Sequence, residues 1–329
     1  MPFEMNITWA CLLLIGGLLL LWKAADLLVD GAVALAKRLG VSSLVIGLTV
    51  IAMGTSAPEV AASVAAAIRG AGDLAVGNVY GSNIANLALV GGICALIAPI
   101  AIQKRLLKRE MPVMLLAALL LWPFLRNLHL SRPEGVVLLS IFIFLILLTI
   151  HIARREGVAK QEITGKQEGS KTGQSSLKKS LFFVIIGLAG LAFGADITVH
   201  GAVYIGQRVG LSKAVIGLTI IAIGTSLPEL VTCVVAALKG HNDISIGNLV
   251  GSNVFNTLLV TGTAGVVRPF SLESPRLAGL DYWIMVTVSA VFVVMGLLFR
   301  RRINRPCGVV LLLGYICYMV YLLYYTAGV

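Results

Sequence analysis

The chain alternates between long apolar runs and short polar segments. Each run is long enough to form a helix, and charged residues gather where the runs end. We expect membrane-spanning helices at residues 7 to 36, 42 to 68, 74 to 101, 111 to 125, 133 to 153, 180 to 207, 212 to 238, 244 to 267, 280 to 299 and 307 to 326. Because a helix needs roughly 20 apolar residues to cross the hydrocarbon layer, the pattern predicts an all-α polytopic membrane protein with ten transmembrane helices.

The composition does not fit a protein whose surface is in contact with water. Hydrophobic residues make up 58% of the 329 residues, charged residues only 12%, and the mean hydropathy is +0.95. Soluble enzymes are therefore excluded, and the lipid bilayer is the expected partner. The net charge of +11 does not indicate nucleic acid, because the basic residues lie between apolar runs as topology signals. No obligate protein partner is evident. The five cysteines form no C-x-x-C motif, and we expect buried apolar fillers.

An internal repeat divides the chain into two halves. GLTVIAMGTSAPE (47 to 59) matches GLTIIAIGTSLPE (217 to 229) at 10 of 13 positions, with an offset of 170 residues. DLAVGNVYGSNIAN (73 to 86) matches DISIGNLVGSNVFN (243 to 256) at the same offset. We therefore predict a first five-span repeat at 1 to 153, a polar linker at 154 to 179 and a second repeat at 180 to 329.

The odd number of spans per repeat requires the second repeat to enter the membrane from the opposite side, as in many secondary transporters. Charge supports this inversion. With the N-terminus outside, the inner loops hold 18 basic residues and the outer loops only seven. We expect a multi-pass protein of the cell inner membrane, with both termini outside and the linker in the cytoplasm. The N-terminus has no basic segment before the first apolar run, so we expect that span to be retained.

Few acidic residues fall inside apolar runs: Asp26, Asp30, Glu59, Asp196 and Glu229. An ionisable group at membrane depth indicates function, because its desolvation is costly. Glu59 and Glu229 are the deepest pair, and each follows a proline that should break its helix and free a backbone carbonyl. For Asp26 and Asp196 we favour structural pairing with nearby Lys23, Lys37 or Arg208.

Oxygen-bearing side chains surround both glutamates in the sequence. On a helical path, Thr55 and Ser56 share a face with Glu59, and Thr225 and Ser226 share one with Glu229. In the following span, polar residues recur every four positions: Asn78, Ser82 and Asn86, then Asn248, Ser252 and Asn256. Gly77, Gly81, Gly247 and Gly251 have the spacing that lets helices approach closely.

This set of oxygens with two carboxylates suits Ca²⁺, and it can also divide into smaller Na⁺ sites. A purely structural role for the glutamates is disfavoured, since it does not require a charge at depth in both repeats. For Asn78 and Asn248 a structural role is as plausible as an ion-binding one, because amides commonly join membrane helices.

With both motifs, G-T-S-x-P-E and G-S-N-x-x-N, present twice, the chain resembles the calcium/cation antiporter superfamily, specifically the prokaryotic sodium/calcium exchanger family. The resemblance implies alternating access, in which the first spans of both repeats slide past the bundle that holds the ions. It implies no cofactor, with Ca²⁺ and Na⁺ as the transported ions. The implied ligands are Glu59, Glu229, Thr55, Thr225, Ser56, Ser226, Ser82, Ser252, Asn86, Asn256, Ala52 and Ala222. Some members carry Asp at the position of Asn256, which leaves the counter-ion open.

Three other classes of membrane protein could carry polar residues at this depth. An intramembrane protease would need two aspartates in a G-x-G-D-like context, a serine with a histidine, or an H-E-x-x-H motif, and we find no such catalytic pair or motif in the sequence. A channel usually has its symmetry axis along the pore, whereas an inverted repeat favours a gated central site. The nearest alternative is a Ca²⁺/H⁺ antiporter, in which protons on Glu59 and Glu229 replace Na⁺. The sequence predicts a secondary-active antiporter that exchanges Ca²⁺ for Na⁺ and is not an enzyme.

Overall fold

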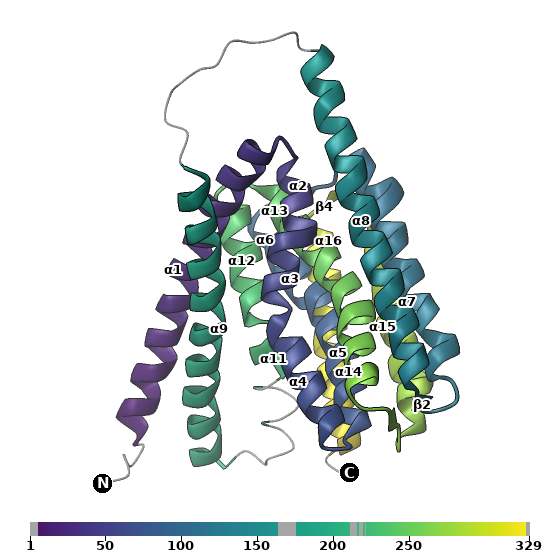
Figure 1. Cartoon of the computed structure of the whole chain (residues 1–329). Coiled ribbons are helices and arrows are strands. Elements are labelled where there is room, and N and C mark those ends of the chain that lie inside the picture. Colours follow the sequence, from purple (N-terminus) through teal and green to yellow (C-terminus); the bar gives the residue numbers. More distant parts are fainter. Residues whose placement is uncertain (1–5, 164–175, 211–215, 217–219, 221, 327–329) are drawn as a thin grey trace.

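The computed structural model describes residues 6–163, 176–210, 216, 220 and 222–326, and these are almost entirely helical (Figure 1). By length and apolar composition, seven of the described helices can cross a membrane, or eight if one bent pair counts as a single span. The start of α1 and the end of α16 lie at one end of the molecule, called here the termini end. Helix α8 ends and α9 begins at the opposite end, called here the linker end (Figure 1).

Helices α1 (Ile7–Leu39) and α9 (Leu177–Arg208) form a pair at one side of the molecule. They run in opposite directions, since α1 begins at the termini end and α9 at the linker end (Figure 1). Glycine permits their close approach. A Cβ added at Gly187 would lie 2.8 Å from Leu28 N, and one at Gly17 would lie 2.9 Å from Thr198 N. Any side chain at these positions would force the two backbones apart.

The first half continues as a set of interrupted helices. Ordinary α-helical turns alternate with π-helical segments, in which each hydrogen bond spans one more residue. The elements are α2 (Ser43–Ile46), η1 (Gly47–Ile51), α3 (Ala52–Thr55), α4 (Ala57–Ile68), α5 (Gly72–Ile84), η2 (Ala85–Val90), α6 (Gly91–Ile97), η3 (Leu106–Glu110), α7 (Met111–Leu125) and α8 (Arg132–Ile163).

The described part of the second half follows the same order. Its elements are α11 (Ala222–Thr225), α12 (Leu227–Leu238), α13 (Asn242–Val254), η5 (Phe255–Val260), α14 (Thr261–Val267), the 3-10 turn η6 (Pro275–Ala278), α15 (Leu280–Leu298) and α16 (Arg305–Thr326). Both η2 and η5 occupy the same place after the Gly-Ser-Asn sequence.

Two short antiparallel strand pairs connect the halves. Strand β1 (Ile100–Ala101) pairs with β4 (Arg302–Ile303), with Ile100 opposite Ile303. Strand β2 (His129–Leu130) pairs with β3 (Phe270–Ser271), with Leu130 opposite Phe270. The pairs lie at opposite ends of the bundle, β4 at the linker end and β2 at the termini end (Figure 1).

The central helices are those that carry the repeated polar motif. In the segments Gly72–Ile97 and Asn242–Val267, 72% of the most apolar window is buried, against 33% for α1 and 17% for α8. They are also the least apolar of the seven candidate spans in the described part of the chain. Polar residues are therefore concentrated on the helices that contact the least lipid, which is where intramembrane polar groups are tolerated.

The expected ten spans are borne out in part. Segment 42 to 68 is broken in the middle, 111 to 125 corresponds to the 15-residue helix α7, and positions 212–215, 217–219 and 221 of the seventh span lie outside the described residues. Residues 164–175 of the linker also lie outside them. The expectation of five buried cysteines is wrong for two. Cys94, Cys233 and Cys307 are buried, but Cys11 and Cys317 are exposed on the outer faces of α1 and α16.

Candidate ion-binding site

Each glutamate lies just after a break in its helix, as the sequence predicts. Helix α3 ends at Thr55 and α4 begins at Ala57, with a bend of 42° between the two segments. The residue at the break, Ser56, has φ −82° and ψ 4°. Ser226 separates α11 from α12 with nearly the same angles, −89° and 4°. The prolines occupy the first turns of α4 and α12, where a missing N–H costs no hydrogen bond.

Glu59 and Glu229 are both 0% exposed and both lie in the first turn of a helix. The positive end of the helix dipole favours a carboxylate there. The two side chains are close enough for the charge of Glu229 to act on Glu59, and the Ser82 hydroxyl lies near Glu59 as well. Among the described residues, none hydrogen-bonds to either carboxylate oxygen of Glu59 or to Oε2 of Glu229.

The Ser56 hydroxyl does not bond to Glu59, which the helical spacing predicts as its neighbour. Ser56 Oγ donates to Glu229 Oε1 at 3.2 Å, so it serves the glutamate of the other repeat and not Glu59. The helix break at Ser56 is the cause, because it interrupts the i to i+3 relation that the prediction assumed. Ser252 Oγ also donates to Glu229 Oε1, at 3.5 Å. The site therefore combines groups from both repeats.

The first asparagine of each polar stripe holds helices together. Asn78 Nδ2 donates to the Glu59 carbonyl at 3.2 Å and to Ser63 Oγ at 2.9 Å. Asn248 Nδ2 donates to Cys233 Sγ at 3.3 Å, and its Oδ1 accepts from Thr55 Oγ1 at 3.2 Å. These contacts favour the structural alternative for Asn78 and Asn248, since both amides position the break that carries a glutamate.

The last asparagine of each stripe is placed differently. Asn86 lies on η2 and Asn256 on η5, and both are 0% exposed. Neither the amide nitrogen nor the amide oxygen of either residue has a hydrogen-bond partner among the described residues. A buried amide without a partner is costly. The two oxygens are therefore suited to a cation, as the family resemblance implies for both asparagines.

Most of the other candidate residues are buried as well. Ser82 is 2% and Ser252 0% exposed, and Thr55 is 1% exposed. Ala52 is buried, and its carbonyl accepts from Ser56 N at 3.0 Å. Ser226 is buried with no partner for its hydroxyl in the described part of the chain. Thr225 ends α11, and Ala222 begins it.

The described residues contain no group of three or more His, Cys, Asp or Glu side chains placed to hold a metal ion. A cation bound here would therefore meet two carboxylates together with hydroxyl, amide and carbonyl oxygens. This is the hard, all-oxygen environment that Ca²⁺ and Na⁺ prefer.

Sequence reasoning missed a second layer of buried amides. Asn83 Nδ2 donates to Thr257 Oγ1 at 2.9 Å and contacts Met285 Sδ at 3.4 Å. Asn253 Nδ2 donates to the Leu249 carbonyl at 2.7 Å. Both asparagines belong to the repeated Gly-Ser-Asn sequence, so the repeat itself was the signal. It was overlooked because only every fourth residue was taken as one face.

The expected ion pairs of the first spans have other partners. Asp26 pairs with Lys239, with 2.5 Å between Nζ and Oδ1, and Asp30 pairs with the same lysine at 2.7 Å. Asp196 faces His200 one turn on, at 3.5 Å. The structural pairing predicted for Asp26 is supported, but its partner is Lys239 of a distant helix and not Lys23 or Lys37. Arg208 hydrogen-bonds to Tyr204 and not to Asp196, whose exposed contact with His200 does not support the predicted ion pair.

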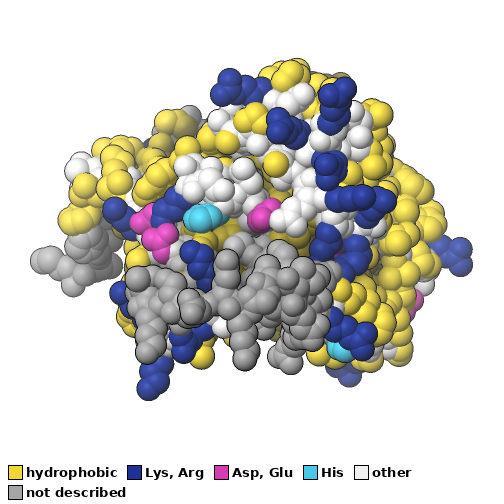
Figure 2. Space-filling model, turned by 90° about the horizontal axis from the view of Figure 1, so that it is seen from above, with side chains coloured by type: hydrophobic (Ala, Val, Ile, Leu, Met, Phe, Trp, Pro, Cys, Tyr) yellow, Lys and Arg dark blue, Asp and Glu magenta, His cyan; other side chains and the backbone are white. Residues whose placement is uncertain are grey.

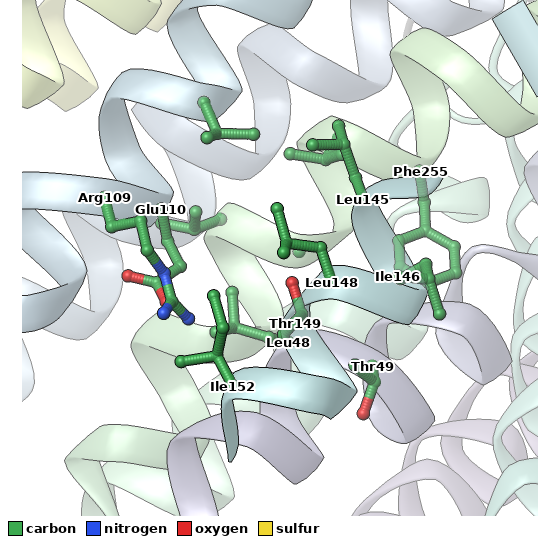
Figure 3. A pocket seen from close by; sticks show the side chains of 14 residues that line it. Leu48, Thr49, Arg109, Glu110, Leu145, Ile146, Leu148, Thr149, Ile152 and Phe255 are labelled. Carbon is green, nitrogen blue, oxygen red and sulfur yellow. The ribbon is translucent and has the colours of Figure 1, made fainter. Parts of the chain in front are cut away.

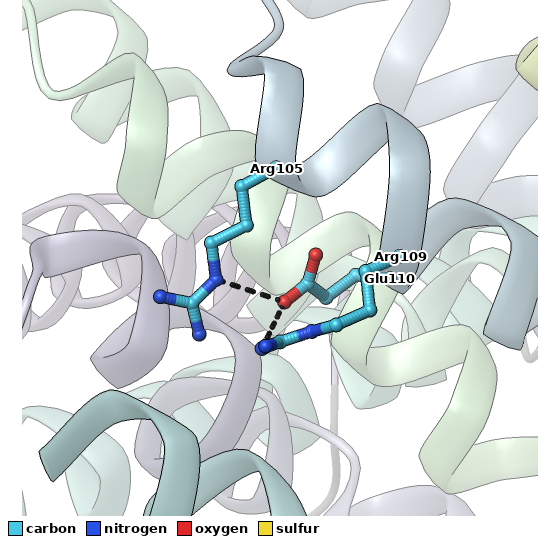
Figure 4. Close-up of polar contacts among 3 residues, drawn as sticks. All are labelled: Arg105, Arg109 and Glu110. Carbon is cyan, nitrogen blue, oxygen red and sulfur yellow. Dashed lines mark hydrogen bonds and ion pairs between the residues drawn. The ribbon is translucent and has the colours of Figure 1, made fainter. Parts of the chain in front are cut away.

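A cavity of about 70 Å³ lies apart from the glutamates, between α8, η1, η3 and α13 (Figure 3). Its lining is mostly apolar, with Thr49, Thr149, Arg109 and Glu110 as the polar side chains, and it contains none of the twelve candidate residues. Glu110 is a buried acid that the sequence analysis did not single out. Its Oε1 lies 3.3 Å from Arg105 Nε and 2.5 Å from Arg109 Nη2 (Figure 4). Because two arginines neutralise it, this acid is not a second ion site.

Comparison with known proteins decides the family. The model of the family described as sodium/calcium exchanger protein matches residues 9–151 and 179–324. The chain belongs to the sodium/calcium exchanger family. The two matched segments cover both repeats and leave out most of the linker, as expected if the transport machinery resides in the repeats alone.

Relatives along nearly the whole chain agree. The chain is 40% identical to the putative antiporter CaxA of Alkalimonas amylolytica, covering 94% of this chain and 97% of that protein. It is 33% identical to the sodium/calcium exchanger MaX1 of Methanosarcina acetivorans, covering 97% and 99%. The solved structure of the sodium-calcium exchanger NCX_Mj soaked with 10 mM Na⁺ and 10 mM Sr²⁺ matches with a TM-score of 0.81 and 30% identity, covering 96% of this chain and 99% of that one.

Proposed function

We propose that this exchanger moves Ca²⁺ across the membrane in exchange for Na⁺, by alternating access to one site between the two repeats. The observation that carries the proposal is the pair Glu59 and Glu229. Both carboxylates are fully buried, each begins a half-helix, and three of their four oxygens accept no hydrogen bond from a described residue. Two buried carboxylates in a low-dielectric interior must be neutralised, and the many oxygens around them favour a bound metal cation over protons alone.

In this proposal each group has a defined role. Glu59 and Glu229 neutralise Ca²⁺, and Thr55 and Thr225 supply further oxygens. Na⁺ ions use smaller sets of neutral oxygens at the edges of the same site, since Na⁺ carries half the charge. The remaining ligands are the serines, asparagines and carbonyls of the candidate set: Ser56, Ser226, Ser82, Ser252, Asn86, Asn256, Ala52 and Ala222.

The proposal includes ten membrane crossings arranged as two inverted five-helix repeats. Three features support it: the constant offset of 170 residues, the opposite directions of α1 and α9, and the two strand pairs (Figure 1). Each strand pair joins one strand of the first half to one of the second, at opposite ends of the bundle. A two-fold axis in the membrane plane would exchange these pairs.

We place the linker end in the cytoplasm and both termini outside. Figure 2 shows the linker end, where Lys and Arg side chains are spread over the face and Asp and Glu side chains are few. Excess positive charge is typical of the cytoplasmic side. The cell inner membrane is the proposed location, since bacterial outer membranes hold β-barrels and the described residues are almost entirely helical.

Proteoliposomes test the function directly. Vesicles loaded with Na⁺ and diluted into Na⁺-free buffer should accumulate external ⁴⁵Ca²⁺, and vesicles loaded with choline should not. A separately imposed pH gradient should drive little uptake. If the pH gradient alone drives equal uptake and Na⁺ is dispensable, the Ca²⁺/H⁺ reading replaces the present one.

The same assay tests the site. Glu59→Gln and Glu229→Gln should each abolish Ca²⁺ uptake, because one of only two charges opposing a divalent ion is lost while the side-chain shape is kept. Glu273→Gln is the matched control, since Glu273 lies in the loop before η6, away from the bundle centre, and should transport normally. Wild-type flux in either purified glutamine variant of the pair would remove Glu59 and Glu229 from the site.

A further inference from the structure

The contacts between α1 and α9 obey the symmetry of the sequence repeat. A Cβ added at Gly31 would lie 3.1 Å from the Ser180 carbonyl oxygen, and one at Gly201 would lie 2.7 Å from that of Ala10. The offset of 170 residues exchanges these two contacts. Backbones packed this closely move together. We therefore treat α1 and α9 as one unit.

The fit of this unit against the rest of the molecule is not symmetric. Val235 and Ala236 of α12 pack against α1 and are 2% and 0% exposed. Their equivalents on α4 in the first repeat, Ala65 and Ala66, are exposed and half-buried. Helix α1 lies along α12, whereas α9 makes no comparable contact with α4. Between these two pairs of equivalent helices, the described contact is that of α1 with α12, and α12 ends toward the linker end (Figure 1).

An ion-pair cluster occupies the closed end. Lys239 caps α12, and its Nζ lies 2.5 Å from Asp26 Oδ1 and 2.7 Å from Asp30 Oδ1, both on α1. Burial lowers the pKa of Lys239, but hydrogen bonds and the charges of the two aspartates outweigh it and hold the pKa above its ordinary value. Lys239 is therefore charged near neutral pH and connects the bundle to the moving unit.

The equivalent cluster at the other end is not formed. Arg69 caps α4 with φ −80° and ψ −2°, nearly the angles of Lys239, −80° and 0°. Among the described residues Arg69 makes no ion pair. Asp196, the equivalent of Asp26, instead faces His200 on its own helix, and their side chains are 65% and 67% exposed. The charged groups are present, but they are unconnected.

We propose that Lys239 is a positioning residue of the exchange cycle. In this conformer Lys239 holds α1 against the bundle. In the opposite conformer it releases Asp26 and Asp30, and Arg69 pairs with Asp196. The proposal rests on the alternating access proposed above. A slide of the α1–α9 unit that closes α9 on α4 must separate α1 from α12, because the unit is rigid. Each conformer then carries one set of ion pairs.

Loss of the Lys239 ion pairs should change the KM for Ca²⁺ modestly and in opposite directions at the two ends. Partly exposed ion pairs stabilise a conformer only slightly, so they adjust the balance between two states and do not fix it. Lys239→Met removes the charge and keeps most of the side-chain stem. It should raise the KM for Ca²⁺ at the termini end roughly threefold and lower the KM at the linker end by a similar factor, because the conformer open at the termini end becomes rarer. Arg69→Met should shift both constants the other way.

Right-side-out and everted membrane vesicles give the two constants separately. Lys239→Arg should restore the wild-type values, since it keeps the charge. Lys37→Met is the matched control, because Lys37 is exposed in the last turn of α1 and forms no ion pair with a described residue. A merely structural lysine would change expression or kcat without opposite shifts at the two ends. The proposal is overturned if Lys239→Met leaves both constants unchanged, or shifts them in the same direction as Arg69→Met.

Cross-linking gives a readout that does not depend on transport. One cysteine pair replaces Asp30 and Lys239, and a second replaces Asp196 and Arg69, all in a Cys-free background. A short bis-methanethiosulfonate reagent should link either pair alone, and linking the first pair should prevent linking of the second. If wild-type protein shows no Na⁺-driven Ca²⁺ flux but the links exclude each other, the proposed function fails and the ion-pair exchange stands. If both links form in one molecule, the ion-pair exchange is wrong whatever the flux.

Discussion

Removal of the Ser56 hydroxyl tests how the two halves of the ion site differ. Ser56 Oγ donates to Glu229 Oε1 at 3.2 Å, from one repeat to the other. The equivalent hydroxyl, on Ser226, is buried but has no partner among the described residues. Ser56→Ala therefore removes a hydrogen bond that orients Glu229, whereas Ser226→Ala removes none.

The size of the effect follows from this geometry. A hydrogen bond to a charged group contributes about 1.5 to 3 kcal/mol. The distance of 3.2 Å is long for a hydroxyl donating to a carboxylate, so the lower value of about 1.5 kcal/mol applies. Since 1.4 kcal/mol is about a factor of ten in Kd, Ser56→Ala should weaken Ca²⁺ binding roughly tenfold. For Ser226→Ala the expected loss is at most about threefold, the cost of a small cavity.

Calorimetric titration of purified protein with Ca²⁺ in choline buffer measures this without Na⁺ competition. Ser140→Ala is a suitable control, because Ser140 is exposed on α8 and its hydroxyl donates only to the Val136 carbonyl of its own helix. Equal losses of Ca²⁺ affinity in Ser56→Ala and Ser226→Ala would refute the reasoning. They would mean that both serines ligate Ca²⁺ directly and that the hydrogen bond to Glu229 does not matter.

Three further predictions address topology, packing and pH. Single cysteines at Lys108 and Arg126, in a Cys-free background, should be labelled from opposite sides by an impermeant thiol reagent, and same-side labelling would discard the proposed topology. Gly247→Ala should lower the melting temperature, because its Cβ would lie 2.9 Å from the Leu44 carbonyl oxygen and overpacking costs about 1 to 3 kcal/mol. Gly314→Ala should leave the melting temperature unchanged, because no described atom lies within 4 Å of the new Cβ. The KM difference between wild type and Lys239→Met should be constant from about pH 6 to 9. The pKa of Lys239 is raised above 10.5, so the lysine stays charged throughout this range, and its contribution is lost on the alkaline side only as the pH rises through the raised pKa.

The hydrophobic pattern predicted most helix positions well, because lipid-facing helices must be apolar along their length. Helix α1 was expected at 7 to 36 and spans Ile7–Leu39, and α15 was expected at 280 to 299 and spans Leu280–Leu298. The pattern did not predict the π-helical segments η1, η2, η3 and η5. A π turn differs from an α turn by one residue of hydrogen-bond spacing, and a run of apolar residues fits both.

For the site, the sequence located the glutamates and the breaks but not the contacts between repeats. The proline before Glu59 and the one before Glu229 were sufficient to locate the helix breaks, since proline has a fixed local effect on a helix. The donation from Ser56 to Glu229 depends on how two half-helices meet, and no local pattern contains that information. The close packing predicted for Gly247 and Gly251 is confirmed by their approach to η1 and the residues before it. The positions that would face Gly77 and Gly81 by the same offset, 214 and 218, lie outside the described residues.

The departures from two-fold symmetry are of two kinds, and they carry different information. Ser56 and Ser226 are identical residues in different environments, as are Glu59 and Glu229, so their difference belongs to the conformer and should reverse in the opposite one. Other repeat positions differ in the residue itself. Asp30 corresponds to His200, which carries no negative charge in either protonation state.

The second kind of difference persists in both conformers and biases the balance between them. At the linker end Lys239 meets two carboxylates, those of Asp26 and Asp30. At the termini end Arg69 has only one equivalent carboxylate within the repeat, that of Asp196, and His200 competes for it. The conformer closed at the linker end should therefore be the more stable when no ion is bound. A symmetric fold thus gives the exchanger two related states, and a few unequal residues decide which of them the empty protein prefers.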